Sequence, residues 1–346
     1  MNQPIHKLAI LLFTLLLAAC AKAPPKLNVL AYPGMIDPRI TAEFEAQFQC
    51  KIVIDNIDSP ESMIAKLAAG GTALYDIVVP DHASVQPMVQ RGLLASLRHE
   101  NIPNLKNIDP SFTNSLSDPG NRYGAPISWG FIGIYARRSP GQAIDESLAI
   151  IFDPSKQPGP FLLFDYSYPC INAALLYKGY KLGTTNLHEL AEARDLLIDV
   201  KKRFLGFADP VLCRNRVLNK EASFALVTNQ DGAVGMKEDP DTYFFVPRGG
   251  VDSWFNNLAI PSNAPQRDLA EKFINHLLEA KIAAQNALFS ETCTPNRAAL
   301  ELIPAKERGN VALFPSTEII KILKSPPPVI EQAKLYDEIW TQIKAK

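Results

Sequence analysis

The sequence Tyr75-Asp76-Ile77-Val78-Val79-Pro80-Asp81 predicts a short buried strand that ends at a proline. Three β-branched residues in a row favour a strand, and Pro80 ends it because proline has no N–H for a sheet. In α/β proteins, ligands bind beyond the carboxyl ends of strands, beside the N-termini of the next helices. We therefore expect Asp81 at a ligand site, although an aspartate here can also cap a helix over residues 84–92.

Strands and helices alternate on both sides of this stretch, which indicates an α/β fold with a mostly parallel sheet covered by helices. In the first part of the chain we expect strands at 27–31, 50–55 and 75–80, and helices at 38–48, 59–69 and 84–92. After the midpoint we expect strands at 160–164, 224–228 and 243–246, and helices at 170–180 and 187–204.

Two extended apolar segments, 127–135 and 254–261, separate these units, and the second precedes a predicted helix over 267–289. Extended crossings can form a hinge, because a few dihedral angles bend without disturbing a core. A length of 346 residues also favours two domains. We predict one lobe from 27–131 plus 257–301 and another from 132–256 plus 302–346.

The N-terminus predicts export. Residues 8–17 form an apolar run too short to span a bilayer comfortably, as in a signal peptide over residues 1–19. The run ends in Leu17-Ala18-Ala19-Cys20, which resembles a bacterial lipobox. We expect Cys20 to be acylated and residues 20–26 to tether the folded part to a bacterial membrane on its periplasmic side.

Charge, cysteine content and missing motifs exclude several classes of function. Lys plus Arg number 35 against 36 Asp plus Glu, so no bulk charge suggests nucleic acid as a partner. Four cysteines remain after Cys20; they allow Cys170–Cys213 and Cys50–Cys293 pairs, or four buried free thiols. No metal-ligand spacing and no catalytic motif is present, so we predict a protein without cofactor, metal site or enzymatic activity. We also expect a monomer.

The chain resembles the periplasmic spermidine/putrescine-binding proteins of ABC transporters from residue 27 to its C-terminus. The matching segments are residues 75–80, Trp129-Gly130, Gly249-Gly250 through Trp254, Asn257-Leu-Ala-Ile-Pro261 and Thr294-Pro-Asn296. The resemblance implies a type II-like, two-lobed periplasmic binding protein fold. It also implies that the lobes close on a polyamine and pass it to a membrane permease.

The resemblance also proposes ligand-binding positions, namely Tyr32, Asp81, Asp165, Tyr166, Thr228, Trp254 and Asn256. In that family, aromatic rings and carboxylates hold the ammonium groups, a sensible chemistry for a desolvated cation. Several family carboxylates are missing here: Gly34, Asn256, Tyr166 and Pro169 occupy their positions. Thr228 and Met35 replace aromatic residues, whereas Asp81 replaces a serine.

Two interpretations of the ligand follow. Asp81, Asp165 and Asp231 can rebuild an acidic pocket for a polyamine. Alternatively, Asn229, Gln230 and Asn256 can serve a less cationic or zwitterionic solute through neutral hydrogen bonds. An exported enzyme on the same scaffold is a further alternative, because a fold does not determine a function. The sequence leaves the ligand, the membrane and the permease open.

Overall fold

The computed structural model describes residues 23–138, 141, 144–324 and 330–346. Cys20 and the apolar run before it lie outside these residues, so the signal peptide and the lipid anchor stay predictions. Within the described residues, no helix combines the length and the apolarity needed to cross a bilayer.

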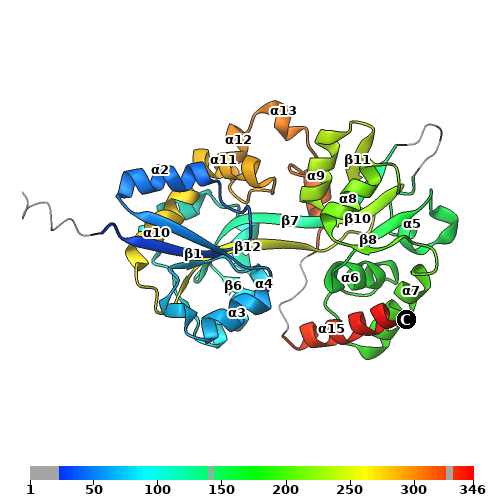
Figure 1. Ribbon diagram of the computed structural model, residues 1–346, viewed down its shortest axis with the longest axis horizontal. Coiled ribbons are helices and arrows are strands. Elements are labelled where there is room, and N and C mark those ends of the chain that lie inside the picture. Colours follow the sequence, from blue (N-terminus) through cyan, green and yellow to red (C-terminus); the bar gives the residue numbers. More distant parts are fainter. Residues whose placement is uncertain (1–22, 139–140, 142–143, 325–329) are drawn as a thin grey trace, which may run out of the picture.

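The molecule has two lobes joined by long strands (Figure 1). The first lobe contains β1 (Lys26–Ala31), α2 (Pro38–Phe48), β2 (Lys51–Asn56), α3 (Pro60–Ala68), β3 (Ile77–Val78), α4 (His82–Gln90), β4 (Leu94–Ala95), the hairpin β5 (Asn114–Ser115) and β6 (Asp118–Pro119), and α10 (Arg267–Leu277). The second lobe contains α5 (Ala149–Phe152), β8 (Phe161–Phe164), α6 (Ser167–Tyr177), α7 (Leu187–Val200), β9 (Gly206–Ala208), α8 (Pro210–Leu218), β10 (Phe224–Thr228), α9 (Asn229–Glu238), β11 (Thr242–Phe245) and α15 (Ile330–Ala345).

The connecting strands are β7 (Gly124–Arg137) and β12 (Ser253–Pro261), which pair antiparallel from Ser253↔Phe131 to Ala259↔Gly124. Four further helices, α11 (Ala280–Ser290), α12 (Arg297–Leu302), α13 (Ala305–Arg308) and α14 (Thr317–Ile322), follow α10. The predicted hinge of extended crossing segments is confirmed. The exact lobe boundaries stay a prediction, because β7 and β12 run through both lobes.

The strand order repeats in the two lobes. It is β2-β1-β3-β12-β7 in the first and β9-β8-β10-β7-β11 in the second, so the 14-residue β7 belongs to both halves. The sheet is mixed rather than mostly parallel. β7 leads the chain into the second lobe and β12 leads it back, so β12 runs antiparallel to both β7 and β3.

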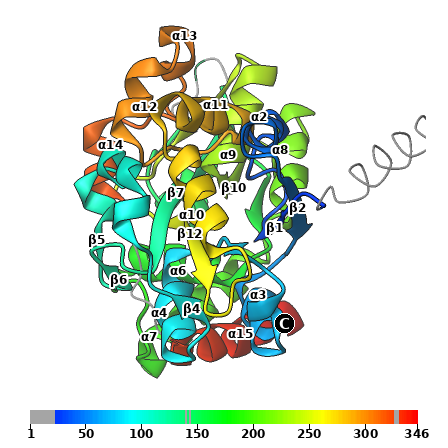
Figure 2. The ribbon, with the colours of Figure 1, turned by 90° about the vertical axis from the view of Figure 1, so that its left-hand side faces the viewer.

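Alternating side chains bury both faces of the first-lobe sheet, as strand geometry requires. Leu27 and Val29 of β1 pack with α2 and α10, whereas Leu30 packs on the other side with α3 and α4. Figure 2 looks onto this lobe and shows α10 in front of β12. In the second lobe, α6, α7 and α15 cover one face, and α8 and α9 cover the other.

Some predicted boundaries were wrong. The strand expected at 75–80 is only Ile77–Val78, and the helix expected at 84–92 begins at His82. The helices expected at 170–180 and 187–204 are Ser167–Tyr177 and Leu187–Val200. The helix expected at 267–289 is two helices, broken where Glu279 takes an extended conformation with ψ 134°. α10 packs on the sheet while α11 packs on α12, and one straight helix cannot reach both.

The four described cysteines, Cys50, Cys170, Cys213 and Cys293, are buried free thiols. Of the two alternatives from the sequence, the structure has the unpaired one. Burial raises the pKa of each thiol, so the sulfurs behave as small apolar groups.

Candidate functional site

A cavity of about 790 Å³ lies between the two lobes. Its walls come from the segments that follow β1, β2, β3, β8 and β10, and its floor comes from β7 and β12. Carboxyl ends of strands therefore meet at one place from both lobes, as expected for ligand sites of α/β proteins. The volume is ordinary for a small-molecule site.

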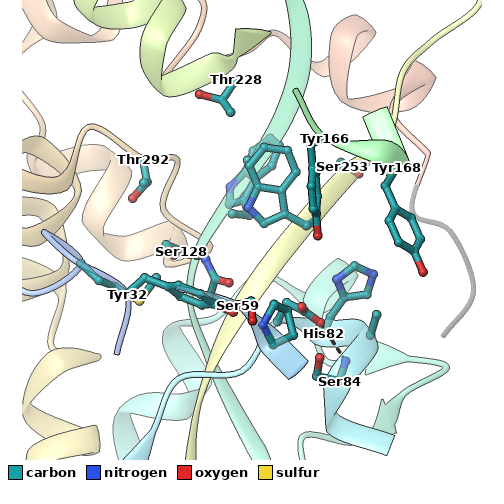
Figure 3. A pocket seen from close by; sticks show the side chains of 18 of the residues that line it. Tyr32, Ser59, His82, Ser84, Ser128, Tyr166, Tyr168, Thr228, Ser253 and Thr292 are labelled. Atoms are coloured by element: carbon teal, nitrogen blue, oxygen red, sulfur yellow. Dashed lines mark hydrogen bonds between the residues drawn. The ribbon is translucent and has the colours of Figure 1, made fainter. Parts of the chain in front are cut away.

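Aromatic side chains line much of the cavity: Tyr32, Trp129, Phe164, Tyr166, Tyr168 and Trp254. Figure 3 shows Tyr32 entering from the first lobe, while Tyr166 and Tyr168 enter from the second. The rings of Tyr166 and Tyr168 lie 6.1 Å apart, and Tyr168 lies 4.9 Å from Tyr336 of α15. Ring faces of this kind can contact a cation.

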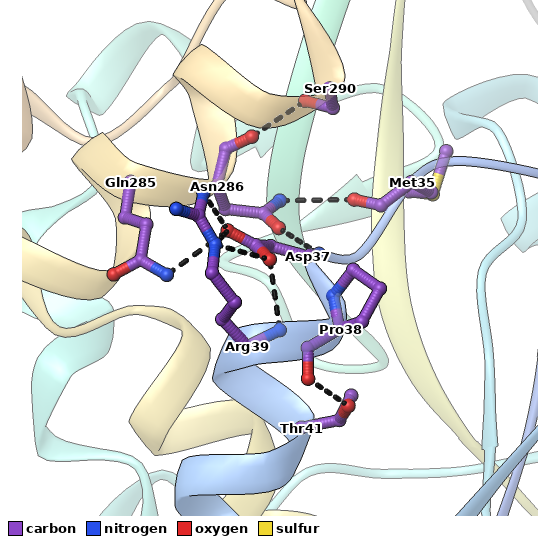
Figure 4. A network of polar contacts seen from close by, with 8 residues as sticks. All are labelled: Met35, Asp37, Pro38, Arg39, Thr41, Gln285, Asn286 and Ser290. Carbon is purple, nitrogen blue, oxygen red and sulfur yellow. Dashed lines mark hydrogen bonds and ion pairs between the residues drawn. The ribbon is translucent and has the colours of Figure 1, made fainter.

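The loop that contains Tyr32 is fixed from behind by α11 (Figure 4). Asn286 Nδ2 donates to the carbonyl oxygen of Met35 at 3.0 Å, and Asn286 Oδ1 accepts from the amide of Asp37 at 2.9 Å. Gln285 Nε2 donates to Asp37 Oδ2 at 3.0 Å, and Arg39 pairs with the same carboxylate. This network, whose Asp37 and Asn286 are buried, holds the segment after β1 at the cavity.

Trp254 lies against β7 at a residue without a side chain. A Cβ placed on Gly130 would be 2.7 Å from Cζ2 of Trp254 and 2.7 Å from Oδ1 of Asn229. Only glycine leaves room for the indole here. The same Asn229 oxygen accepts the amide of Phe131 at 3.0 Å, which fixes the floor of the cavity.

The charges that line the cavity are mostly negative. Four carboxylates, Asp58, Glu61, Asp81 and Asp252, stand against one guanidinium, Arg91. Burial raises the pKa of Tyr32, and the charges of Asp81, Glu61 and Asp58 raise it further. Burial also raises the pKa of Tyr166, assisted by Glu61, Asp81, Asp337 and Asp252. Both tyrosines stay neutral at physiological pH in a site that attracts cations.

Asp81 both caps a helix and lines the cavity. Its Oδ1 accepts the amide of Ser84 at 2.8 Å, as an N-cap of α4 does, and its backbone pairs with Asn256 of β12. Because the cap uses Oδ1, the second oxygen is available to a ligand. The helix-cap interpretation of Asp81 is therefore confirmed, and contact with a ligand stays a prediction that its place in the cavity allows.

Asn256 and Thr228 also line the cavity, but their polar groups have protein partners. Asn256 Nδ2 donates to Oγ of Ser128 at 3.1 Å. Thr228 Oγ1 donates to Oδ2 of Asp231 at 2.6 Å and accepts the amide of the same residue as the N-cap of α9. Of the predicted site residues, Tyr32, Asp81, Tyr166, Thr228, Trp254 and Asn256 meet in this cavity.

Asp165 does not line the cavity, nor does Asp231. Asp165 follows β8 at the surface, where Nζ of Lys344 donates to its two oxygens at 2.8 and 2.7 Å. Asp231 is buried and pairs with Arg214 at 3.2 Å. The acidic pocket is therefore not rebuilt from these two residues, because each already has a cationic partner elsewhere.

Three cavity carboxylates were missed by sequence reasoning: Asp58, Glu61 and Asp252. Asp58 and Glu61 follow β2 at the start of α3, so the strand-end rule that selected Asp81 could have found them. No local pattern indicates Asp252. It lies beside Asn172 of α6, whose Nδ2 donates to Asp252 Oδ2 at 3.1 Å, and burial raises the pKa of Asp252 to about 6.

Known binding proteins are similar to this chain in sequence and in fold over most of its length. The spermidine/putrescine-binding periplasmic protein of Escherichia coli is 28% identical over 314 residues, covering 90% of this chain and 89% of that protein. The putrescine/cadaverine-binding protein of Pseudomonas aeruginosa is 28% identical over 348 residues, covering 95% and 96%. A crystal structure of the spermidine/putrescine ABC transporter substrate-binding protein from Streptococcus pneumoniae has a TM-score of 0.83 at 25% identity, covering 93% of this chain and 99% of that one.

The model of the bacterial extracellular solute-binding protein family matches residues 39–309, which include both connecting strands, most of both lobes and all residues that line the cavity except those at 32–35. The protein therefore belongs to the bacterial extracellular solute-binding protein family.

Proposed function

We propose that the protein binds a polyamine of the putrescine or spermidine class between its lobes and delivers it to the permease of an ABC importer. The observation that supports this most is the lining of the cavity, with four carboxylates, one arginine and six aromatic rings. Ammonium groups removed from water need anionic partners, and cations are attracted to the faces of aromatic rings. The relatives described above carry polyamine names, which supports the same class of ligand.

Binding would proceed by closure of the lobes about β7 and β12. Open lobes admit the ligand, and closure removes water from the ammonium groups, which strengthens their attraction to the carboxylates. No chemical step is required. We therefore propose a binding protein without catalysis, and mass spectrometry of the released ligand should find it unchanged.

A zwitterionic solute is the second candidate. The carboxylate of such a solute would need a cationic partner. Among the described residues that line the cavity, Arg91 is the single lysine or arginine, and it is exposed just after the end of α4. The excess of negative charge makes this candidate the weaker one.

Calorimetry on the detergent-purified full-length protein tests the proposal with putrescine, spermidine, 4-aminobutanoate and neutral 1,4-butanediol. We expect both polyamines to bind and the other two to bind more weakly by at least tenfold. The D81N variant should lose at least about 1 kcal/mol of polyamine binding, because asparagine keeps the helix cap but not the charge. The D165N variant, which alters a carboxylate outside the cavity, should bind normally. Equal binding of diol and diamine would refute the polyamine assignment.

We further propose that Cys20 carries the lipid anchor and that residues 20–26 tether the two lobes to the periplasmic side of a bacterial membrane. We also propose that the protein is a monomer. Metabolic labelling with palmitate should mark the wild type and not the C20S variant. A C20S protein that still sediments with membranes would contradict the anchor. Sedimentation of the detergent-purified protein tests the monomer.

A further inference from the structure

The described residues contain six buried carboxylates, and five of them are satisfied within the fold. Asp37, Asp231 and Glu271 pair with Arg39, Arg214 and Arg98. Asp76 and Asp118 each accept hydrogen bonds from two backbone amides. None of these five lines the cavity. A buried carboxylate in this protein therefore normally has a cation or a pair of amides as its partner.

Asp252 differs from these five because it lines the cavity. It is 8% exposed, and its carboxyl receives a side-chain hydrogen bond from Asn172 and a backbone hydrogen bond from its own residue. No ion pair of the described residues includes it, and no cation of this part of the chain lowers its pKa. An ionised carboxylate can accept about four hydrogen bonds, so Asp252 can still accept hydrogen bonds from a group inside the cavity.

The carboxylate is held in place from behind. Asn172 is fully buried on α6, four residues after Tyr168 and three after Pro169, which line the cavity, so it lies on the same side of that helix. Tyr336 of α15 donates to Oδ1 of Asn172 at 3.2 Å, which turns the amide nitrogen of Asn172 toward Asp252. The carbonyl oxygen of Asp252 also accepts the amide of Ile132 on β7. Both contacts hold Asp252 on the second-lobe side of the hinge.

The other three cavity carboxylates, Asp58, Glu61 and Asp81, all follow strands of the first lobe; we name them the first-lobe acidic group. Asp252 instead precedes β12 and accepts a hydrogen bond from Asn172 of α6 in the second lobe. The first-lobe acidic group raises the pKa of Tyr32, whereas the pKa of Tyr166 is raised from both lobes, by Glu61 and Asp81 as well as by Asp252. The cavity therefore has carboxylates on both lobes, three at strand ends of the first and one held by a helix of the second.

We infer that Asp252 pairs with one ammonium group of a linear diammonium ligand while the first-lobe acidic group pairs with the other. The inference rests on the proposed function and assigns a specificity role within it. A ligand with charges at both ends bridges the lobes, so Asp252 selects diamines over monoamines and helps to hold the lobes closed.

The test is calorimetry on the detergent-purified full-length protein with 1,4-diaminobutane and with butylamine, which has the same chain and one charge. The variants are D252N, D81N and the matched control D165N. We expect D252N and D81N each to weaken diamine binding by roughly 10- to 100-fold, the usual range for losing a buried charged pair. For butylamine, at most one of the two substitutions should weaken binding, because one ammonium cannot occupy both points. D165N should change neither ligand.

Two results would overturn the inference while leaving the proposed function intact. One is a D252N variant that binds diamine as the wild type does, which would make Asp252 a structural group. The other is a loss of butylamine binding in both D252N and D81N, which would place both carboxylates at a single point. A wild-type protein that binds neither amine would instead overturn the proposed function, and the inference with it. Circular dichroism of each variant verifies that the fold is kept.

Discussion

Replacing Asp252 with asparagine should stabilise the unliganded protein at neutral and alkaline pH. Burial raises the pKa of this carboxyl from an ordinary 3.8 to about 6. One pKa unit corresponds to about 1.4 kcal/mol, so keeping Asp252 ionised in the folded protein costs about 3 kcal/mol. Asparagine is nearly the same size, can keep the hydrogen bond from Asn172, and has no charge to desolvate. Burying the amide of asparagine also costs some desolvation free energy. We therefore expect the free energy of unfolding to rise by about 1–3 kcal/mol.

The sign of the pH dependence follows from linkage. The folded pKa of Asp252 is above the unfolded one, so the folded state holds the proton more tightly, and lowering the pH from about 6 to about 4 favours folding of the wild type. Below about pH 4 the carboxyl is neutral in both states and the advantage of D252N disappears. The charge of Asp252 acts on Tyr166 and Cys170, and burial raises the pKa of both groups away from this range.

Urea unfolding of the wild type, D252N and D165N at pH 8 and pH 4 measures the effect. We expect D252N to unfold at a higher urea concentration than the wild type at pH 8 and at about the same concentration at pH 4, with similar slopes. D165N replaces a half-exposed carboxylate paired with Lys344 and should show no gain at pH 8. A D252N variant that is equally stable to the wild type at both pH values would refute the reasoning.

Three further predictions concern the floor of the cavity and the thiols. The G130A variant should weaken diamine binding about tenfold and lower stability by about 1–3 kcal/mol, because its Cβ would collide with Trp254; unchanged tryptophan emission and affinity would contradict this. The N229A variant should lose about 2–4 kcal/mol in urea unfolding, because it leaves the Phe131 amide and the Ala312 carbonyl oxygen without their hydrogen bonds, and a loss below 1 kcal/mol would argue against it. The four described cysteines should react with a thiol reagent only after denaturation; rapid labelling of the native protein would show the burial to be wrong.

Much of the fold was predictable because it depends on local signals. The helix Pro38–Phe48 follows from a proline in its first turn and apolar residues at helical spacing, and it was predicted to the residue. The strands β7 and β12 were visible as long apolar segments. The break between α10 and α11 was not, because no glycine or proline marks it; it follows from packing against two different partners.

The residues of the candidate site likewise fall into those that a local rule selects and those that only the structure reveals. Strand ends followed by helix starts select Asp81, and the same rule applies to Asp58 and Glu61, because chain direction brings such ends to one edge of a sheet. The rule fails for Asp165, which lies beside a strand end yet pairs with Lys344, 179 residues away in sequence. Whether a carboxylate is free to bind a cation depends on its spatial neighbours.

The sequence by itself therefore determined the two-lobed α/β architecture, the hinge strands and the position of the cleft, since strand period, helix caps and chain order act over a few residues. Only the tertiary structure decided which charges face the ligand. Asp252 can take the role proposed for it because α6, α15 and β12, distant in sequence, bury it next to Asn172, and no ion pair of the described residues includes it. Burial and charge pairing are properties of three-dimensional surroundings, and no local pattern encodes them.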